Sequence, residues 1–238
     1  MFNNISFILN KPQLSENIGA CARAMKNFNF SKLVVINPKP IYPNDKIIAT
    51  SVGAQDIIKK SRIYESIEPA IKNIDCLIST TSRFRNKNIK HIKLNELNKI
   101  DFSKKIAFLF GPEASGLSNN EISFSNYLLQ IPSNSQFQSL NLSHSLIIVA
   151  QATFQLLNMK KSKYSKSKKI KPATKKNIQS MINLCVKHLE EINFFKPKEK
   201  KPKMLENLRS IFYKMDLSQK ETRILSSVFA SLSKKKVD

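Results

Sequence analysis

The sequence predicts an α/β fold with an open, mostly parallel sheet, followed by a small helical extension. Up to about residue 158, short runs rich in β-branched residues alternate with amphipathic helical patterns. Several of these runs are apolar at every position, as strands covered by helices on both faces require. The 238 residues suffice for one sizeable domain with a buried core and a small appendage.

Five segments are expected to form the strands of the sheet: 5–9, 32–36, 75–80, 106–110 and 127–131. A helix is expected over 15–28, because Ser15 is a good cap and apolar residues recur on one face. It should end near Asn29, since asparagine tolerates the left-handed conformation. The last helix of this domain is expected over 139–158.

The composition then changes to a lysine-rich stretch. Nine lysines and no acidic residue lie between Lys160 and Lys176, so this stretch is not expected to pack on a core. The predicted division is an α/β domain over 1–158, an exposed linker over 159–176 and a helical extension over 177–238. Helices are expected in the last part over 175–191, 203–214 and 218–233.

The charge is strongly positive, with 40 Lys and Arg against 17 Asp and Glu, or +23 in total. Such an excess favours a polyanionic partner, because cationic side chains that neutralise phosphates release counterions. Nucleic acid is therefore the leading candidate partner. The alternative is that a Lys-, Asn- and Ile-rich composition reflects a biased genome and that many lysines only solvate the surface.

Cysteine and histidine usage excludes two classes of site. The three cysteines are far apart, are odd in number and show no CxxC spacing, which favours reduced thiols over disulfides. The three histidines are scattered, so no metal site is expected. The first residues lack the pattern of a signal peptide, and no apolar run reaches the roughly 18 residues of a membrane span. We therefore expect a cytoplasmic protein without membrane contact.

The stretch GPEASGLSNN, residues 111–120, follows the apolar run IAFLF and contains two of only four glycines. Glycine is favoured where the backbone adopts a positive φ or where another group approaches closely. A glycine loop directly after a strand is a common nucleotide site in α/β proteins. The stretch matches neither standard phosphate-loop pattern, so a tight structural turn remains the alternative.

Three loop segments together resemble the motifs of SPOUT-class RNA 2′-O-methyltransferases. They are NKPQLSENIGACARAMKNFNFSKLVVINP (10–38), FLFGPEASGLSNNEI (110–122) and IPSNSQFQSLNLSHSL (131–146). Their order and spacing are most similar to the TrmJ type, the tRNA (cytidine/uridine-2′-O-)-methyltransferases. The similarity extends to NLRSIFYKMDLSQKETRIL (207–225), so it covers nearly the whole chain.

This resemblance implies a C-terminal trefoil knot in the sheet, an S-adenosyl-L-methionine cofactor held by the knotted loops, and a homodimer with its active site between subunits. A knot is not expected from pattern alone, because knots are rare. The implied cofactor-binding residues are Thr80, Thr81, Ser82, Gly111, Ile131, Gln138, Ser139 and Leu140. The implied catalytic residues are Arg23, Ser139 and Asn141, and the substrate-binding residues are Asn17, Arg23, Glu113, Lys160, Lys161 and Lys163.

Each polar candidate also has a structural interpretation. A guanidinium is too basic to take a proton, so we expect Arg23 to hold a phosphate or stabilise the developing alkoxide, unless it is only a solvated helix residue. Ser139 could be a helix N-cap, and Asn17 could make a helix-start hydrogen bond. Glu113 either orders its loop or approaches the substrate.

The function expected from this resemblance is S-adenosylmethionine-dependent 2′-O-methylation of a pyrimidine ribose in the tRNA anticodon loop. The alternatives are a SPOUT enzyme that acts on rRNA and a non-catalytic basic RNA-binding protein. The sequence leaves open whether the C-terminal helices bind tRNA or brace the dimer.

Overall fold

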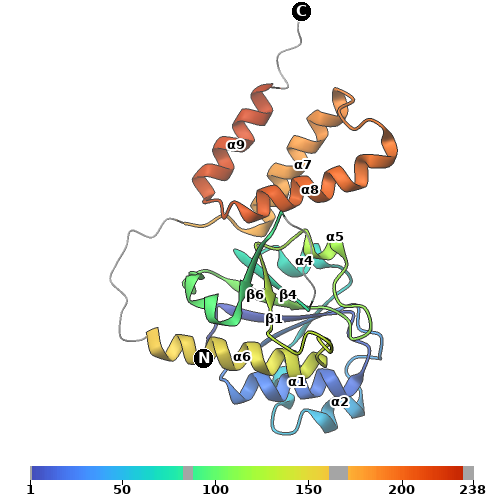
Figure 1. Cartoon of the computed structure of the whole chain (residues 1–238), viewed down its shortest axis with the longest axis vertical. Coiled ribbons are helices and arrows are strands. Elements are labelled where there is room, and N and C mark those ends of the chain that lie inside the picture. Colours follow the sequence, from blue (N-terminus) through green and yellow to red (C-terminus); the bar gives the residue numbers. More distant parts are fainter. Residues whose placement is uncertain (1, 83–87, 161–170, 233–238) are drawn as a thin grey trace, which may run out of the picture.

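The structure is a computed structural model that describes residues 2–82, 88–160 and 171–232. Its centre is a seven-stranded sheet in the order β3-β2-β1-β6-β4-β7-β5, in which every neighbouring pair is parallel (Figure 1). The strands are β1 Ile5–Asn10, β2 Lys32–Ile36, β3 Arg62–Tyr64, β4 Cys76–Thr81, β5 Lys90–Lys93, β6 Ile106–Phe110 and β7 Tyr127–Gln130.

The five predicted strands are confirmed to within one residue at each end, and the sheet is entirely parallel. The two strands that the pattern missed are β3 and β5, which lie at the two edges of the sheet. The residues of β3 are exposed or half-buried, and only Ile92 of β5 is buried. Edge strands of three or four residues therefore lack the continuous apolar run that reveals a central strand.

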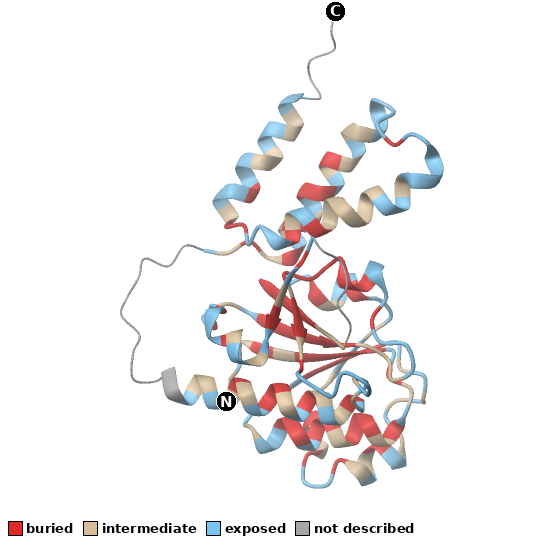
Figure 2. Ribbon diagram, viewed as in Figure 1, coloured by how far each residue is buried: buried red, intermediate tan, exposed pale blue. Residues whose placement is uncertain are grey.

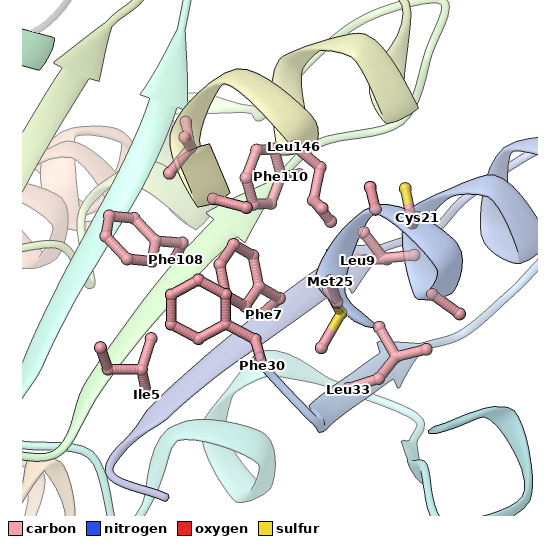
Figure 3. Packing of buried hydrophobic residues seen from close by; sticks show 14 of the residues in the cluster. Ile5, Phe7, Leu9, Cys21, Met25, Phe30, Leu33, Phe108, Phe110 and Leu146 are labelled. Atoms are coloured by element: carbon pink, nitrogen blue, oxygen red, sulfur yellow. The ribbon is translucent and has the colours of Figure 1, made fainter. Parts of the chain in front are cut away.

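One face of the sheet is covered by α1 Ser15–Asn27, α2 Asp45–Thr50, α3 Gln55–Lys59 and α6 Leu142–Lys160 (Figure 1). The ring of Phe7 on β1 packs 5.5 Å from that of Phe108 on β6 and 5.1 Å from that of Phe30 (Figure 3). Met25 of α1 and Leu146 of α6 belong to the same buried cluster as these rings. A 3₁₀ helix, Leu94–Lys99, packs against α6.

The path of α1 follows from two local features. Its C-terminus is closed by hydrogen bonds from the Phe30 amide to the Met25 carbonyl and from the Asn29 amide to the Lys26 carbonyl. Asn29 has φ +61°, which confirms the predicted left-handed stop. At Gly19, a Cβ atom would lie 2.5 Å from the Ile47 carbonyl oxygen, so glycine permits α1 and α2 to pack closely.

The other face is covered by α4 Ile67–Ile71, α5 Asn119–Ile122 and the helices that follow the lysine-rich stretch. These are α7 Lys175–Glu191, the 3₁₀ turn Lys198–Lys200, α8 Lys201–Lys214 and α9 Gln219–Leu232. Ile178 and Tyr213 belong to the same buried cluster as Ile8 of β1. Figure 2 shows burial concentrated in the sheet and in helices packed on its two faces, such as α1 and α7, with α9 largely uncovered.

Two expectations about this part of the chain need correction. The segment 159–176 was expected to stay off any core, yet Ala173 is fully buried and Lys175 is only 1% exposed. Residues 161–170 of that segment lie outside the described part of the chain. The helix expected over 139–158 begins at Leu142, because Asn141 caps it by accepting the Ser143 amide at 2.8 Å. None of the described helices is long and apolar enough to cross a membrane.

Candidate active site

The loops that follow β4, β6 and β7 meet at the C-terminal edge of the parallel sheet and enclose a pocket of about 410 Å³. This volume is in the range of small-molecule sites. The strand order reverses between β1 and β6, because β2 lies on one side of β1 and β4 lies beyond β6. Such a switch point, at the carboxyl ends of the strands, is where open α/β sheets bind ligands.

The pocket gathers most of the residues expected from the sequence. All eight expected cofactor-binding residues line it, together with Glu113. They come from three separate loops, at 80–82, 111–117 and 131–140. The sequence places these loops about 20 to 60 residues apart, and the parallel sheet brings them together because their strands are close in the sheet.

The two glycines of the second loop have different roles. Gly116 has φ +64°, a left-handed backbone conformation that residues other than glycine and asparagine rarely adopt. At Gly111, a Cβ atom would lie 2.4 Å from the Leu117 amide nitrogen and 2.5 Å from the Gly116 carbonyl carbon. The loop therefore folds back on its own first residue, and the Gly116 amide closes it by donating to the Pro112 carbonyl at 2.9 Å.

Glu113 connects this loop to the segment before α1. Its carboxylate accepts hydrogen bonds from the Gln13 amide at 2.8 Å, the Leu14 amide at 3.3 Å and the Asn17 side-chain amide at 2.7 Å. These donors are about 100 residues earlier in the chain. Glu113 is therefore a positioning residue that joins the loops after β1 and β6 across the switch point.

Asn17 extends this connection to the third loop. It is 6% exposed, and its side-chain oxygen accepts a hydrogen bond from the side-chain amide of Asn141 at 2.9 Å. Asn141 in turn caps α6 through its own side-chain oxygen. Side-chain hydrogen bonds from Asn17 to Glu113 and from Asn141 to Asn17 thus link all three motif segments. Ser139 lies two residues before Asn141.

Arg23, unlike the expected cofactor-binding residues, does not line the pocket of its own chain. It lies on the exposed face of α1. Within the described residues, no acceptor pairs with its guanidinium. Lys160 is the last residue of α6, with its side chain outside the description, and Lys161 and Lys163 lie outside the described residues.

Two features of the site were not predicted from the sequence. Phe137 lines the pocket although it is 76% exposed, and its only signal was an aromatic residue in a polar loop. Glu121 accepts hydrogen bonds from Asn10 at 2.8 Å and Lys11 at 2.9 Å, and so fastens α5 to the end of β1. Burial alone would raise the pKa of Glu121, but the bonds from the Ser118 amide, Lys11 and Asn10 hold it below its usual value.

The pocket suits the adenosine part of S-adenosylmethionine. Its inner wall is apolar and buried, and consists of Phe110, Leu117, Ile122, Ile131 and Leu142. Hydroxyl groups and backbone of Thr80, Thr81, Ser82 and Ser139 supply polar groups beside that wall. Among the described residues, no group of three or more His, Cys, Asp or Glu side chains could hold a metal ion.

Comparisons with known proteins agree with this geometry. The profile of the SpoU rRNA Methylase family matches residues 4–151. An uncharacterized tRNA/rRNA methyltransferase of Haemophilus influenzae is 28% identical over 99% of this chain and 97% of its own length. The tRNA (cytidine/uridine/adenosine-2′-O-)-methyltransferase TrmJ of Pseudomonas aeruginosa is 27% identical over 98% of this chain and 95% of its own length.

The crystal structure of TrmJ from Z. mobilis ZM4 superimposes with a TM-score of 0.85 at 26% identity. The match covers 96% of this chain and 99% of that one, so it includes the C-terminal helices. Methylases of the SpoU type use S-adenosylmethionine, and their fold implies a trefoil knot. With its family profile matched from β1 into α6 and its pocket built from the loops of that fold, the chain belongs to the SpoU rRNA Methylase family.

Proposed function

We propose that this protein transfers a methyl group from S-adenosylmethionine to the 2′-hydroxyl of a pyrimidine ribose in the anticodon loop of tRNA. The observation that carries this proposal is the match over the full chain, C-terminal helices included, to proteins named TrmJ. A family resemblance limited to residues 4–151 would support RNA methylation in general. The net charge of +23 suits a polyanionic substrate of this kind.

The chain's residues have three tasks in this reaction. S-adenosylmethionine supplies an activated methyl group, so the protein must align donor and acceptor and stabilise the charge that develops on the ribose oxygen. Thr80, Thr81, Ser82, Gly111, Ile131, Gln138 and Leu140 would hold the cofactor. Ser139 would contact the reacting ribose, and Asn141 would fix its loop through the bond to Asn17.

Arg23 would be supplied to the pocket by a second copy of the chain. Its position on the exposed face of α1, outside the pocket of its own protomer, supports this arrangement. We therefore propose a homodimer with one active site at each junction between the pocket of one protomer and α1 of its partner. The guanidinium, which stays protonated, would hold a phosphate or the developing alkoxide.

A second candidate function is 2′-O-methylation of rRNA. It is favoured by the name of the family profile and by the Haemophilus influenzae relative named for both RNA classes. Both functions use the same pocket, so the pocket does not distinguish them. The C-terminal helices are the part of the chain that sets the substrate in our proposal.

Mapping of ribose methylation tests the proposal directly. Purified protein and S-adenosylmethionine are incubated separately with unmodified tRNA and with ribosomal RNA. Each RNA is then cut by a ribonuclease, and mass spectrometry of the nucleosides and of the oligonucleotide fragments identifies the methylated nucleoside and its position. We expect 2′-O-methylcytidine or 2′-O-methyluridine from one anticodon-loop position of tRNA. Methylation of rRNA alone would establish the second candidate. No transfer to either RNA, from protein whose melting temperature rises with the cofactor, would favour a non-catalytic RNA-binding role.

A further inference from the structure

Phe137 is more exposed than expected for an aromatic residue that only stabilises the fold. It is 76% exposed, whereas the apolar side chains of the pocket's inner wall, such as Ile131 and Leu142, are buried. An exposed phenylalanine contributes little to folding, because its ring stays in water. Among the described residues that line the pocket, Phe137 carries the exposed aromatic ring, and such a ring is a side chain on which proteins stack a planar base.

The backbone around Phe137 is fixed by hydrogen bonds. The Phe137 amide donates to the Asn134 carbonyl at 3.0 Å, and the Gln136 amide donates to the Asn134 side-chain oxygen at 3.0 Å. The Ser133 hydroxyl donates to the Gln138 carbonyl at 3.4 Å. This turn presents the ring at a set place in the loop, two residues before Ser139.

The neighbours of Phe137 are polar. Ser135, Gln136, Gln138 and Ser139 also line the pocket, and they provide hydroxyl and amide groups but no charge. The one carboxylate of the lining, Glu113, is engaged by the loop before α1. A protein partner would be expected to cover a larger apolar patch, whereas one ring among neutral polar groups matches one unstacked base.

We propose that Phe137 stacks on the base of the nucleotide whose ribose is methylated. This inference rests on the proposed function, and it names the group that holds the target nucleotide. Bases in single-stranded RNA loops can be splayed out and stacked on an aromatic side chain, which compensates for the stacking that they lose in the loop. Because every base has a π-face, the ring fixes the nucleotide without selecting cytidine over uridine.

The test is a double-mutant cycle between Phe137 and the target base. The substrates are an anticodon stem-loop RNA in which methylation has been mapped to one pyrimidine, and the same RNA with an abasic ribose at that nucleotide, which keeps the 2′-hydroxyl. The proteins are wild type, Phe137→Ala, Phe137→Tyr and the control Phe194→Ala. Phe194 is also exposed, at 49%, and lies outside the pocket.

With the intact RNA, we expect Phe137→Ala to lower kcat/KM by roughly 5- to 150-fold, equally for cytidine and uridine, and Phe137→Tyr to retain it. With the abasic RNA, wild type and Phe137→Ala should be equal, since no base remains to stack. Phe194→Ala should keep the wild-type ratio between the two RNAs.

Other outcomes would overturn the inference. Equal losses on both RNAs would show that Phe137 acts independently of the base. A weaker affinity for S-adenosylhomocysteine in Phe137→Ala would place the ring on the cofactor, and dissociation of the dimer would place it at the subunit contact. If wild-type protein methylates no stem-loop RNA or tRNA, the proposed function itself fails and the inference fails with it.

Discussion

The loops of the pocket are joined to one another by side-chain hydrogen bonds, whereas the last helix of the chain leaves apolar side chains uncovered. In the pocket, Glu113 and Asn17 connect segments about 100 residues apart through hydrogen bonds of 2.7 to 2.9 Å. In the helices, α9 has one buried residue, Thr222, and carries the exposed side chains of Ile224, Val228 and Leu232. These three line an open groove of about 840 Å³ that also includes Lys171 and Arg223.

This difference shows how the two regions relate to a substrate. The hydrogen bonds of Glu113 and Asn17 join the loops around the pocket to one another, as catalysis by alignment requires. The helices leave apolar and cationic groups uncovered, although α7 itself packs firmly on the sheet. We infer that substitutions in the pocket act mainly on turnover, whereas substitutions in and around the helices act mainly on RNA affinity or on stability.

The largest loss of activity is expected at Arg23, which lies on α1, outside both the pocket and the C-terminal helices of its own chain. Arg23→Ala should lower kcat by about 100-fold or more, because in the proposed mechanism it removes a donor that acts on the transition state. Affinity for S-adenosylhomocysteine, measured by calorimetry, should stay within twofold. Arg62→Ala on the edge strand β3 is the matched control, since Arg62 is exposed and remote in the sheet. Equal activity of the two variants would contradict a role for Arg23.

The second-largest loss of activity is expected at Glu113, whose hydrogen bonds join the loops of the pocket. Glu113→Gln removes the charge that three donors share, so the loops after β1 and β6 should separate slightly. We expect kcat to fall about 10- to 100-fold and the free energy of unfolding to fall by about 1 kcal/mol. Activity assays and urea denaturation check both. Glu65→Gln, an exposed control, should change neither.

A third prediction concerns RNA affinity and the lysine-rich stretch. If these lysines contact phosphates, each lost contact lowers the slope of log affinity against log salt by roughly 0.7 to 0.9. The slope for tRNA should fall by about two or three units, with unchanged cofactor affinity, when glutamine replaces Lys160, Lys161, Lys163, Lys166, Lys168 and Lys169. An unchanged slope would move the RNA contact to the α/β domain or to the helices after Lys203.

The smallest effect is expected where α7 meets the sheet. Lys175 donates to the Phe124 carbonyl at 3.2 Å and to the Asn126 side chain, and its Nζ lies 4.2 Å from the centre of the Tyr213 ring. Burial lowers the pKa of Lys175 to about 7. The unfolded chain, with an ordinary lysine pKa near 10.4, therefore binds more protons between about pH 7 and pH 10.

The free energy of unfolding should consequently rise with pH in that window. Above pH 7 the buried amine of Lys175 is mostly neutral in the native state, while the unfolded chain still binds its proton. The melting temperature of wild type relative to Lys175→Met should increase from pH 7 to pH 9 by a few degrees. Lys176→Met is the control, since Lys176 is exposed and adjacent. A difference that stays constant with pH would show that Lys175 is buried with an ordinary pKa.

How far the sequence predicted the fold depended on burial. The strands β1, β2, β4, β6 and β7 are buried on both faces, so their apolar runs were unambiguous. The edge strands gave no such signal. Lys175 was assigned to an exposed linker because a charged side chain is rarely buried. Its burial is explained by the Phe124 carbonyl, which accepts a hydrogen bond from its Nζ, and by the Tyr213 ring beside the same atom.

The site was predicted as a set of residues, but not as a connected structure. The similarity of the motifs identified the loops that meet at the pocket, and it left the role of Glu113 open between ordering the loop and contacting substrate. The structure supports an ordering role, because the donors to its carboxylate come from the loop after β1. Hydrogen bonds across about 100 residues leave no local pattern, so sequence reasoning could not find them.

The central claim is that one methyl-transfer site is shared by the pocket of one protomer and Arg23 of its partner. Mixed dimers test it most directly. Arg23→Ala is combined by co-refolding with a second variant, Ser139→Trp, whose indole should block the pocket; calorimetry must first verify that this variant binds no S-adenosylmethionine. Each variant alone should be inactive on tRNA. Random mixing in equal amounts makes half of the dimers mixed, each with one intact junction, so we predict about a quarter of wild-type activity. No recovery, from dimers shown to be mixed, would contradict a shared site.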